Sequence, residues 1–424
     1  MKARHILIIS YVFPPNKGIG GRRWAKFAKY LAKSGHKIFV IHCAGEEADL
    51  GSPWSKDVAD PAIQCYSLPK KYPTVLSKRP LNSILDKLAY RYWLKILPHK
   101  VKGNIFDKTV NWRSQLLNKC NELIEAHGIE NVIVTGAPFR LLFFALELKE
   151  HNVNLIGDLR DPWTWNDAYG YENLGEERMA FEEHMEKEVM EKFDHVLSPA
   201  QDILDRIMLK YPGVDHSKFT RIAHAFDRDD MEAGIEMKKS DETIRFIYAG
   251  GFYDIDETNA YMHALIQSVS GLIEKDISLR ENVKIDFYVP AQDIGRFEKW
   301  IKDANVSEQI RFWPPISASE VFTKIMNSDY VLAFLPSARK EFLSTKYSEI
   351  FSLGVPVIHV GPEGYVSHFI DEHKTGFSFR VNELQEKLEW IIKERPKASP
   401  NRSLIASLFD IEQITEQLER DILI

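Results

Sequence analysis

The sequence predicts two doubly wound α/β domains that face each other across a cleft. Short apolar runs alternate with amphipathic stretches along most of the 424 residues, and loops rich in glycine and proline separate them. A charged segment at residues 227–242 interrupts this alternation, which then restarts, so we interpret it as an interdomain linker. Strand–helix–strand units with short connections imply parallel sheets. Because such sheets bind ligands at the carboxyl ends of their strands, we expect a ligand in the cleft.

The first forty residues form the first strand–helix–strand unit. Residues 5–10 are a short apolar strand, and residues 13–21 form a loop whose prolines and glycines exclude a helix. Residues 22–34 are predicted to be helical because apolar side chains recur at i, i+3, i+4 and i+7, and Gly35 ends the helix. A second apolar strand follows at residues 37–43. The apolar helix positions are Trp24, Phe27, Ala28 and Leu31.

The same alternation continues on both sides of the linker. In the N-terminal part we predict strands at residues 131–135, 154–157, 195–198 and 219–223, and helices at residues 140–150 and 176–192. In the C-terminal part we predict strands at residues 243–249, 284–289, 310–313, 330–335 and 356–360, and helices at residues 258–273, 292–304, 318–327, 345–352 and 365–372. The predicted domains are residues 1–226 and 240–400, followed by a helix at 401–424 that packs back toward the N-terminal domain.

Composition and charge exclude several classes of protein. Hydrophobic residues make up 44% and charged residues 27% of the chain, which excludes disordered and low-complexity proteins. The net charge of −6 argues against a dedicated nucleic-acid binder. No run of 18 apolar residues occurs, and Cys43, Cys65 and Cys120 are too few for a disulfide framework, so we expect a cytoplasmic protein.

Residues 66–120 depart from the rest of the chain in their charge. They carry twelve basic and two acidic side chains, a net charge of +10, with seven aromatic side chains among them. The segment either contacts an anionic lipid surface or a lipid-phosphate substrate, or it is a solvated insertion packed by its own aromatic residues. The apolar residues that could share one face of a helix here are Leu81, Ile84, Leu85, Leu88 and Tyr92.

The first loop is a candidate phosphate-binding site. It lies between a strand and a helix N-terminus, where backbone N–H groups and the positive end of the helix dipole suit an anion. Gly20 and Gly21 allow close approach of the backbone, and Arg22 and Arg23 add positive charge. The loop lacks the GxGxxG spacing of a nicotinamide-cofactor site. A glycine loop of this kind can also be no more than a turn.

A second candidate site lies in the C-terminal domain. Glu341 and Glu349 are eight residues apart, an E-x7-E pattern, and Lys346 lies between them. A carboxylate accepts hydrogen bonds from vicinal sugar hydroxyls, and a lysine nearby suits a diphosphate. The alternative is an ordinary i, i+3 surface pair between Lys346 and Glu349. The apolar strand at residues 354–358 favours a binding site, because a helix that leads directly into a buried strand places Glu349 at the cleft.

The order and spacing of these motifs resemble glycosyltransferases of the GT-B fold, in the large family 4 of retaining nucleotide-sugar enzymes. The resemblance implies two Rossmann-like domains that move a sugar from a nucleotide-diphosphate sugar to a glycan or lipid-linked acceptor, in polysaccharide biosynthesis for the cell envelope. It also implies that the reaction needs no cofactor and no bound metal. The matching segments are residues 8–21, 31–40, 157–163, 246–252, 346–358 and 363–377.

The resemblance also implies roles for particular residues. Glu349 would hold the ribose of the donor, Glu341 would contact the transferred hexose, and Lys346 would neutralise the departing diphosphate. The other donor-binding residues would be Gly20, Gly21, Gly250, Gly251 and, near the base, Trp313. The N-terminal domain would supply Arg160 and Asp161 as catalytic residues and Asp158 and Trp163 as acceptor residues.

Several alternatives stay open. Asp158, Arg160 and Asp161 could instead brace a turn as a buried ion pair, and Trp163 could pack instead of stacking on a sugar. Residues 254–257 are acidic where relatives carry basic side chains for phosphate. A non-catalytic binding or scaffold protein of the same fold, or a nucleotide-sugar epimerase, is therefore the alternative to a transferase. The expected partners are a nucleotide sugar, the acceptor and the anionic inner face of the cell membrane, but not nucleic acid.

Overall fold

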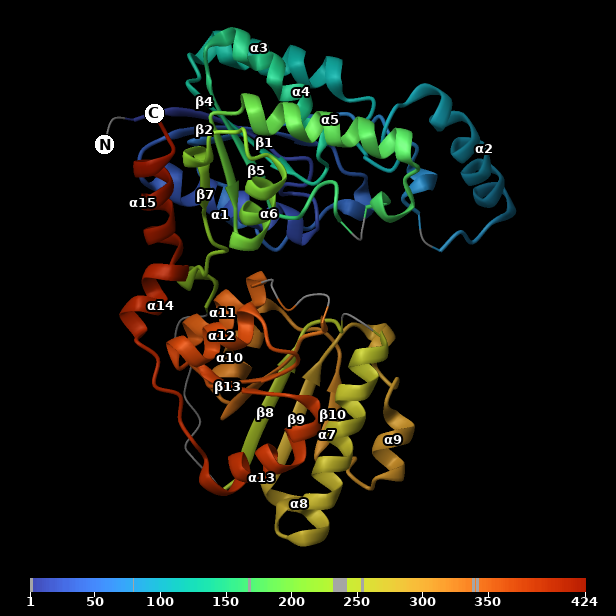
Figure 1. Ribbon diagram of the computed structural model, residues 1–424, viewed down its shortest axis with the longest axis vertical. Coiled ribbons are helices and arrows are strands. Elements are labelled where there is room, and N and C mark those ends of the chain that lie inside the picture. Colours follow the sequence, from blue (N-terminus) through green and yellow to red (C-terminus); the bar gives the residue numbers. More distant parts are fainter. Residues whose placement is uncertain are drawn as a thin grey trace. The chain divides into compact units, whose positions relative to one another are not determined.

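The chain divides into two compact units, coloured from blue to red along the sequence in Figure 1. The computed structural model describes residues 3–78, 80–166, 169–231, 242–252, 255–337, 340 and 343–424. Unit 1 comprises Met1–Ala223 and Ile414–Ile424, and unit 2 comprises His224–Gln413. The linker expected at residues 227–242 falls in unit 2, and its residues 232–241 lie outside the described residues.

A seven-stranded sheet forms the centre of unit 1. Its strand order is β3-β2-β1-β4-β5-β6-β7, of which the first six positions match the order of a dinucleotide-binding α/β fold. Every neighbouring pair is parallel. Between β1 and β2, Ile6 lies opposite Ile38. The strands are β1 (His5–Ile9), β2 (Lys37–Cys43), β3 (Ile63–Leu68), β4 (Asn131–Gly136), β5 (Asn154–Leu159), β6 (His195–Ser198) and β7 (Phe219–Arg221). The helices are α1 (Arg22–Lys33), α2 (Ile84–Lys100), α3 (Arg113–His127), α4 (Arg140–Ala145), α5 (Glu176–Lys192), α6 (Gln201–Lys210) and, largely in this unit, α15 (Ile411–Asp421).

Helix α1 follows its predicted bounds because its apolar stripe packs on the sheet. Trp24 and Leu31 are fully buried, and Gly35 follows the helix with a φ of +90° that favours glycine. The loop before α1 contains one 3-10 turn, Ile19–Gly21, although residues 13–21 were predicted as loop throughout. Three residues suffice for such a turn, which a pattern of prolines and glycines does not exclude.

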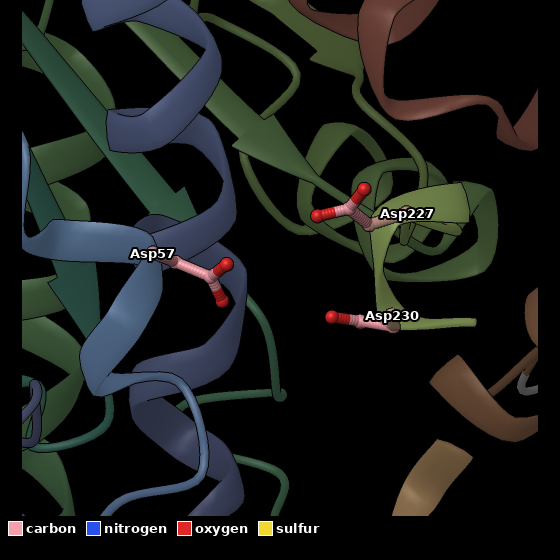
Figure 2. A group of neighbouring side chains, drawn as sticks. All are labelled: Asp57, Asp227 and Asp230. Atoms are coloured by element: carbon pink, nitrogen blue, oxygen red, sulfur yellow. The ribbon is translucent and has the colours of Figure 1, made fainter. Parts of the chain in front are cut away.

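A buried charge on α1 is neutralised by a side chain from outside the helix. Lys26 is 1% exposed, and its Nζ lies 2.9 Å from Oδ2 of Asp57. The 3-10 helix Ser55–Val58 presents the Asp57 side chain, which Figure 2 shows. Lys29 Nζ lies 3.6 Å from the other oxygen of Asp57. Figure 2 also draws Asp227 and Asp230, which belong to unit 2. Such pairing is what allows a lysine to be buried.

Unit 2 repeats this architecture with six parallel strands in the order β10-β9-β8-β11-β12-β13. Its core includes the aromatic residues Tyr248, Phe287 and Phe334, whose ring centres lie 5.4 to 6.2 Å apart. The strands are β8 (Ile244–Ala249), β9 (Val283–Tyr288), β10 (Ile310–Trp313), β11 (Tyr330–Phe334), β12 (Val357–Val360) and β13 (Gly376–Phe379). The helices are α7 (Ile255–Lys275), α8 (Leu279–Asn282), α9 (Glu298–Asp303), α10 (Ala318–Met326), α11 (Thr345–Leu353), α12 (Tyr365–His373), α13 (Leu384–Glu394) and α14 (Arg402–Phe409).

The two parallel sheets confirm the predicted fold class of doubly wound, Rossmann-like α/β domains. The sequence analysis predicted neither the strands β3 and β13 nor the helices α3, α6, α8 and α13, and it gave α2 only as apolar residues that could share one helical face. Within residues 66–120, basic and aromatic side chains obscure the apolar periodicity. The segment at 401–424 contains α14 and α15 instead of one helix. Among the described residues, no helix combines the length and the apolar character that crossing a bilayer requires.

Candidate functional site

Unit 1 gathers charged side chains at the carboxyl ends of β4 and β5. Arg23 Nε donates to both carboxylate oxygens of Asp158 at 3.2 Å, and Trp24 Nε1 and Thr135 Oγ1 donate to the same carboxylate at 2.7 and 3.2 Å. Burial lowers the pKa of the Arg23 guanidinium, and the Asp158 carboxylate counteracts this. Asp158 has no exposed surface, so in this structure it braces α1 against the sheet.

Arg160 joins β4 to the glycine loop. Its Nε donates to Thr135 Oγ1 at 3.1 Å and to Gly136 O at 3.0 Å, and its Nη2 donates to Ala137 O at 3.2 Å. The guanidinium lies against Gly20, where an added Cβ would be 3.0 Å from Nη1. Because Arg160 is only half-buried, it holds a positive charge at this loop with part of its surface open to an anion.

The second glycine of the loop has a structural reason to be glycine. Gly21 is buried, and a Cβ there would lie 3.1 Å from both the Val12 carbonyl oxygen and the Phe13 Cα. The loop folds back closely on its own backbone at this point. This close backbone contact favours glycine at position 21 whether or not a ligand binds.

Asp161 and Trp163 lie in different environments. Asp161 is half-buried, and its Oδ2 accepts a hydrogen bond from Tyr169 OH at 3.2 Å. Trp163 has no exposed surface; its ring stacks on Phe139 with centres 5.3 Å apart, and its Nε1 donates to Glu182 at 2.9 Å. Trp163 therefore packs in the interior here, whereas Asp161 is accessible at the surface.

Unit 2 brings two predicted elements together at the carboxyl end of β8. Lys346 lies in the first turn of α11, and its Nζ is 4.4 Å from the centre of the Tyr248 ring. Gly250 follows β8 with a φ of +117°, and a Cβ there would lie 3.0 Å from Cε and Nζ of Lys346. The Gly250 N–H donates to Tyr288 O at 2.9 Å, and Tyr248 OH donates to Gly251 O at 2.9 Å. The glycine loop and the lysine thus form one cluster.

This cluster suits an anion. Burial lowers the pKa of the Lys346 ammonium to about 8, while the negative charge of Glu349 raises it, so the lysine remains charged at pH 7. The backbone N–H groups at the N-terminus of α11 add positive potential. No acidic side chain in the first turn of α11 opposes it. Glu349 lies three residues after Lys346 in α11 and is half-buried.

The acidic residues that the sequence analysis singled out in this unit are only partly described. Glu341 and Asp254 lie outside the described residues. The Glu257 carboxylate accepts hydrogen bonds from the Ser337 N–H at 2.7 Å and from Tyr261 OH at 3.0 Å. Glu257 therefore fastens the loop that follows β11 to the first turn of α7, a role that the acidic sequence at residues 254–257 does not reveal.

Trp313 lies at the end of β10 and is 38% exposed. Its Nε1 donates to Asp286 Oδ1 at 2.7 Å, and the Arg311 guanidinium lies 5.4 Å from its ring centre. Arg311 donates from Nε and Nη2 to the two oxygens of Asp286 at 3.0 and 3.1 Å. The indole is thus fixed while part of its surface stays open, as stacking of a planar base requires. A cavity of about 440 Å³ adjoins Asp286 and Arg311.

Arg296 is a residue that the sequence reasoning missed. Its guanidinium carbon lies 6.0 Å from the ring centre of Phe252, the residue after the glycine loop, and its Nη2 donates to Asn259 Oδ1 at 2.9 Å. Its Nη1 lies 3.6 Å from Asp293. Residues 292–304 were predicted as one helix, but α9 begins only at Glu298, so Arg296 lies in a loop. The sequence signal that could have identified Arg296 is an arginine shortly after the end of a predicted strand.

Comparisons with known proteins support the fold through structure alone. No protein-family model matches the sequence. No curated protein matches it either. The structure is similar to a sucrose-phosphate synthase from Thermosynechococcus elongatus, with a TM-score of 0.63, 13% identity and 98% coverage of both chains. It is also similar to a glycosyltransferase from Rickettsia africae ESF-5, with a TM-score of 0.60, 13% identity and coverage of 98% of this chain and 97% of that one.

A third similar structure has a different activity in its name. The UDP-GlcNAc 2-epimerase from Methanocaldococcus jannaschii matches with a TM-score of 0.54, 12% identity and 98% coverage of both chains. At such identities the similarity establishes the fold and no activity. The chain has the GT-B fold with two Rossmann-like domains, as the sequence predicted.

Proposed function

We propose that this protein is a retaining glycosyltransferase similar to family 4, which moves a sugar from a nucleotide-diphosphate sugar to a glycan or lipid-linked acceptor of the cell envelope. The observation that carries the proposal is the Lys346 ammonium, held against Gly250 at the N-terminus of α11. A cation and backbone donors at the carboxyl end of a parallel sheet suit a diphosphate. Solved GT-B structures whose names include a glycosyltransferase and a UDP-sugar enzyme support the same class.

The proposed reaction has simple requirements. The bond between the anomeric carbon and the diphosphate oxygen breaks, and its electron pair leaves on the diphosphate. An acceptor hydroxyl forms the new bond to the same carbon and gives its proton to an oxygen of the departing diphosphate. Negative charge therefore develops on the leaving group, where Lys346 and the α11 N–H groups would stabilise it. Because these groups supply the positive charge, we propose that the reaction needs no metal ion.

We propose further contacts to the same donor. Glu349, one turn along α11, would accept hydrogen bonds from the ribose hydroxyls, and Glu341 would contact the transferred sugar. Trp313 would stack on the base, and Arg296 would place a second cation beside the glycine loop Gly250–Gly251. In the N-terminal unit, Arg160 and Asp161 are the accessible candidates for the acceptor side.

The test is donor binding and donor cleavage in matched variants. We expect Lys346→Met to weaken binding of a nucleoside diphosphate at least tenfold in titration calorimetry and to abolish transfer. Lys299→Met, which changes an exposed lysine on α9, is the control and should bind like the wild type. Unchanged binding and transfer in Lys346→Met would refute the site. The anomeric configuration of the product, read by NMR, tests retention.

Two alternatives give different products. An epimerase releases an epimerised sugar or nucleotide sugar when no acceptor is present, which chromatography of the reaction mixture detects. A binding or scaffold protein retains the nucleotide sugar without any slow hydrolysis. We further propose a cytoplasmic location, because the free cysteines Cys43, Cys65 and Cys120 suit a reducing compartment.

A further inference from the structure

Helix α2 carries an apolar stripe that the rest of unit 1 leaves uncovered. Ile84 and Leu85 are each 77% exposed, Tyr92 is 59% exposed and Leu88 is 56% exposed. Single exposed apolar side chains are common on protein surfaces, but these four lie within an arc of about 100° on one helix. Figure 1 shows α2 at the periphery of unit 1, away from the strands.

The opposite side of α2 already has a core of its own. Leu97 is buried, and Tyr90 and Trp93 pack with it against Tyr72 and Leu76 from the preceding segment. The insertion is therefore packed by its own aromatic residues, as one sequence interpretation expected. The exposed stripe takes no part in this core, so folding of unit 1 does not account for it.

A basic stripe runs beside the apolar one. Lys87, Arg91 and Lys95 are exposed and follow one another at i, i+4 spacing. Within the part of the chain that the structure describes, none of the three has a carboxylate at ion-pair distance. The one acidic residue of α2, Asp86, is bound by Lys78 at 2.6 Å. Like charges at this spacing repel one another, and an anionic surface would remove that repulsion.

We propose that this face of α2 docks on an anionic lipid surface. The apolar stripe would enter the boundary between head groups and acyl chains, while the basic stripe would contact lipid phosphates. A second copy of the chain is a poorer occupant, because it would bring two basic stripes together. The docking face comprises Ile84, Leu85, Leu88 and Tyr92 with Lys87, Arg91 and Lys95.

The docking helix is fastened to the body of unit 1. Arg178 on α5 donates from Nη1 to Val101 O at 2.9 Å and from Nη2 to Pro98 O at 2.6 Å, at the end of α2. Tyr72 OH donates to Ile105 O at 3.0 Å and so joins the segment before α2 to the segment after it. Contact of α2 with a membrane would therefore hold the whole unit at the lipid surface, where a lipid-linked acceptor would be met.

The experiment is co-sedimentation of the full chain with vesicles that contain no sugar acceptor. We expect binding to vesicles of phosphatidylglycerol and phosphatidylcholine, and little binding to phosphatidylcholine alone. The variant Lys87→Glu, Arg91→Glu, Lys95→Glu should bind the anionic vesicles at least about a hundredfold more weakly, since each basic residue near such a surface contributes a factor of about five and each glutamate adds repulsion. The control Lys56→Glu, Lys299→Glu, Lys397→Glu makes the same charge change at exposed lysines elsewhere and should bind like the wild type.

A second variant tests the apolar stripe independently of the basic one. Ile84→Ser, Leu85→Ser, Leu88→Ser keeps every charge and should also lose vesicle binding, with unchanged circular dichroism and unchanged nucleotide binding. Because the readout needs no donor, it can succeed or fail independently of the proposed transferase activity. Equal binding of wild type and both variants would overturn the proposal. A wild type that does not bind the anionic vesicles would also overturn it. The same holds if sedimentation velocity shows that the only effect of the serine substitutions is to convert a dimer to a monomer.

Discussion

The ammonium nitrogen of Lys346 lies 4.4 Å from the centre of the Tyr248 ring. Lys346 belongs to the first turn of α11, and Tyr248 belongs to β8, so the tertiary fold alone brings them together. A cation over an aromatic face gains about 0.5–2 kcal/mol, depending on how far it is desolvated. Tyr248 is fully buried, and its ring packs against Phe252, Phe287 and Phe334. The ammonium is therefore held at the edge of the sheet, beside the glycine loop that begins at Gly250.

The lowered pKa of Lys346 predicts donor binding that depends on pH. With a pKa of about 8, the ammonium is charged at pH 7 and loses its proton as the pH rises past that value. We expect the affinity for a nucleoside diphosphate to be flat below about pH 7.5 and to fall by up to about tenfold per pH unit above pH 8. Titration calorimetry between pH 7 and pH 10 measures this. In Lys346→Arg the charge persists, so whatever affinity remains should be constant over the same range. A flat profile in the wild type would contradict the assigned charge.

We expect the same substitution, glycine to alanine, to weaken diphosphate binding at Gly250 but not at Gly251. Gly250→Ala imposes a φ of +117° on an alanine and places its Cβ 3.0 Å from Lys346 Nζ. We expect a loss of stability of about 1–3 kcal/mol and at least tenfold weaker diphosphate binding, because the ammonium is displaced. At Gly251 the nearest neighbour of an added Cβ is Pro290 Cγ at 3.6 Å, an ordinary contact. Gly251→Ala should therefore bind within about threefold of the wild type, and equal losses in both variants would contradict this geometry.

Removal of the Asp158 carboxylate predicts loss of stability in unit 1. Asp158→Ala leaves Arg23 buried without its charge partner, and breaking a buried pair in this way costs about 3–5 kcal/mol. Glu147→Ala breaks the exposed ion pair with Arg113 and should cost less than about 1 kcal/mol. Urea unfolding followed by circular dichroism compares the two. If Asp158→Ala is as stable as the control but transfers no sugar, Asp158 acts on the acceptor and does not brace the fold.

We expect Trp313→Ala to lose affinity for a different part of the donor than Lys346→Met does. Trp313→Ala removes an exposed ring that would stack on the base, and such stacking contributes about 1–3 kcal/mol per base. We expect Trp313→Ala to weaken binding of a free nucleoside and of a nucleoside diphosphate by the same factor, about tenfold. Lys346→Met should spare the nucleoside. Calorimetry with both ligands separates the two variants, and loss of only the diphosphate in Trp313→Ala would rule out stacking on the base.

Local patterns in the sequence determined the fold class. Apolar strands and amphipathic helices repeat with short connections. A helix that connects two successive strands crosses over the sheet, so the strands run parallel and helices cover both faces. The exposed stripe on α2 was also readable as a face, although Leu81 is half-buried whereas Ile84, Leu85 and Leu88 are exposed. Gly250, Gly251 and Lys346 could be recognised from the sequence, because a motif specifies residue type and spacing.

Tertiary structure alone decided which charges are buried and which meet. The helix at 176–192 is rich in acidic side chains, yet Glu182 and Glu186 have no exposed surface because Arg140 and Lys210 reach them from other elements. Asp158 and Trp163 likewise turned inward, whereas Arg160 met Gly20 from across the sheet. Periodicity reports how often a side chain faces the core, but a charge can be buried only where a distant partner compensates its lost hydration. That partner is supplied by the crossover connections, which no local pattern encodes.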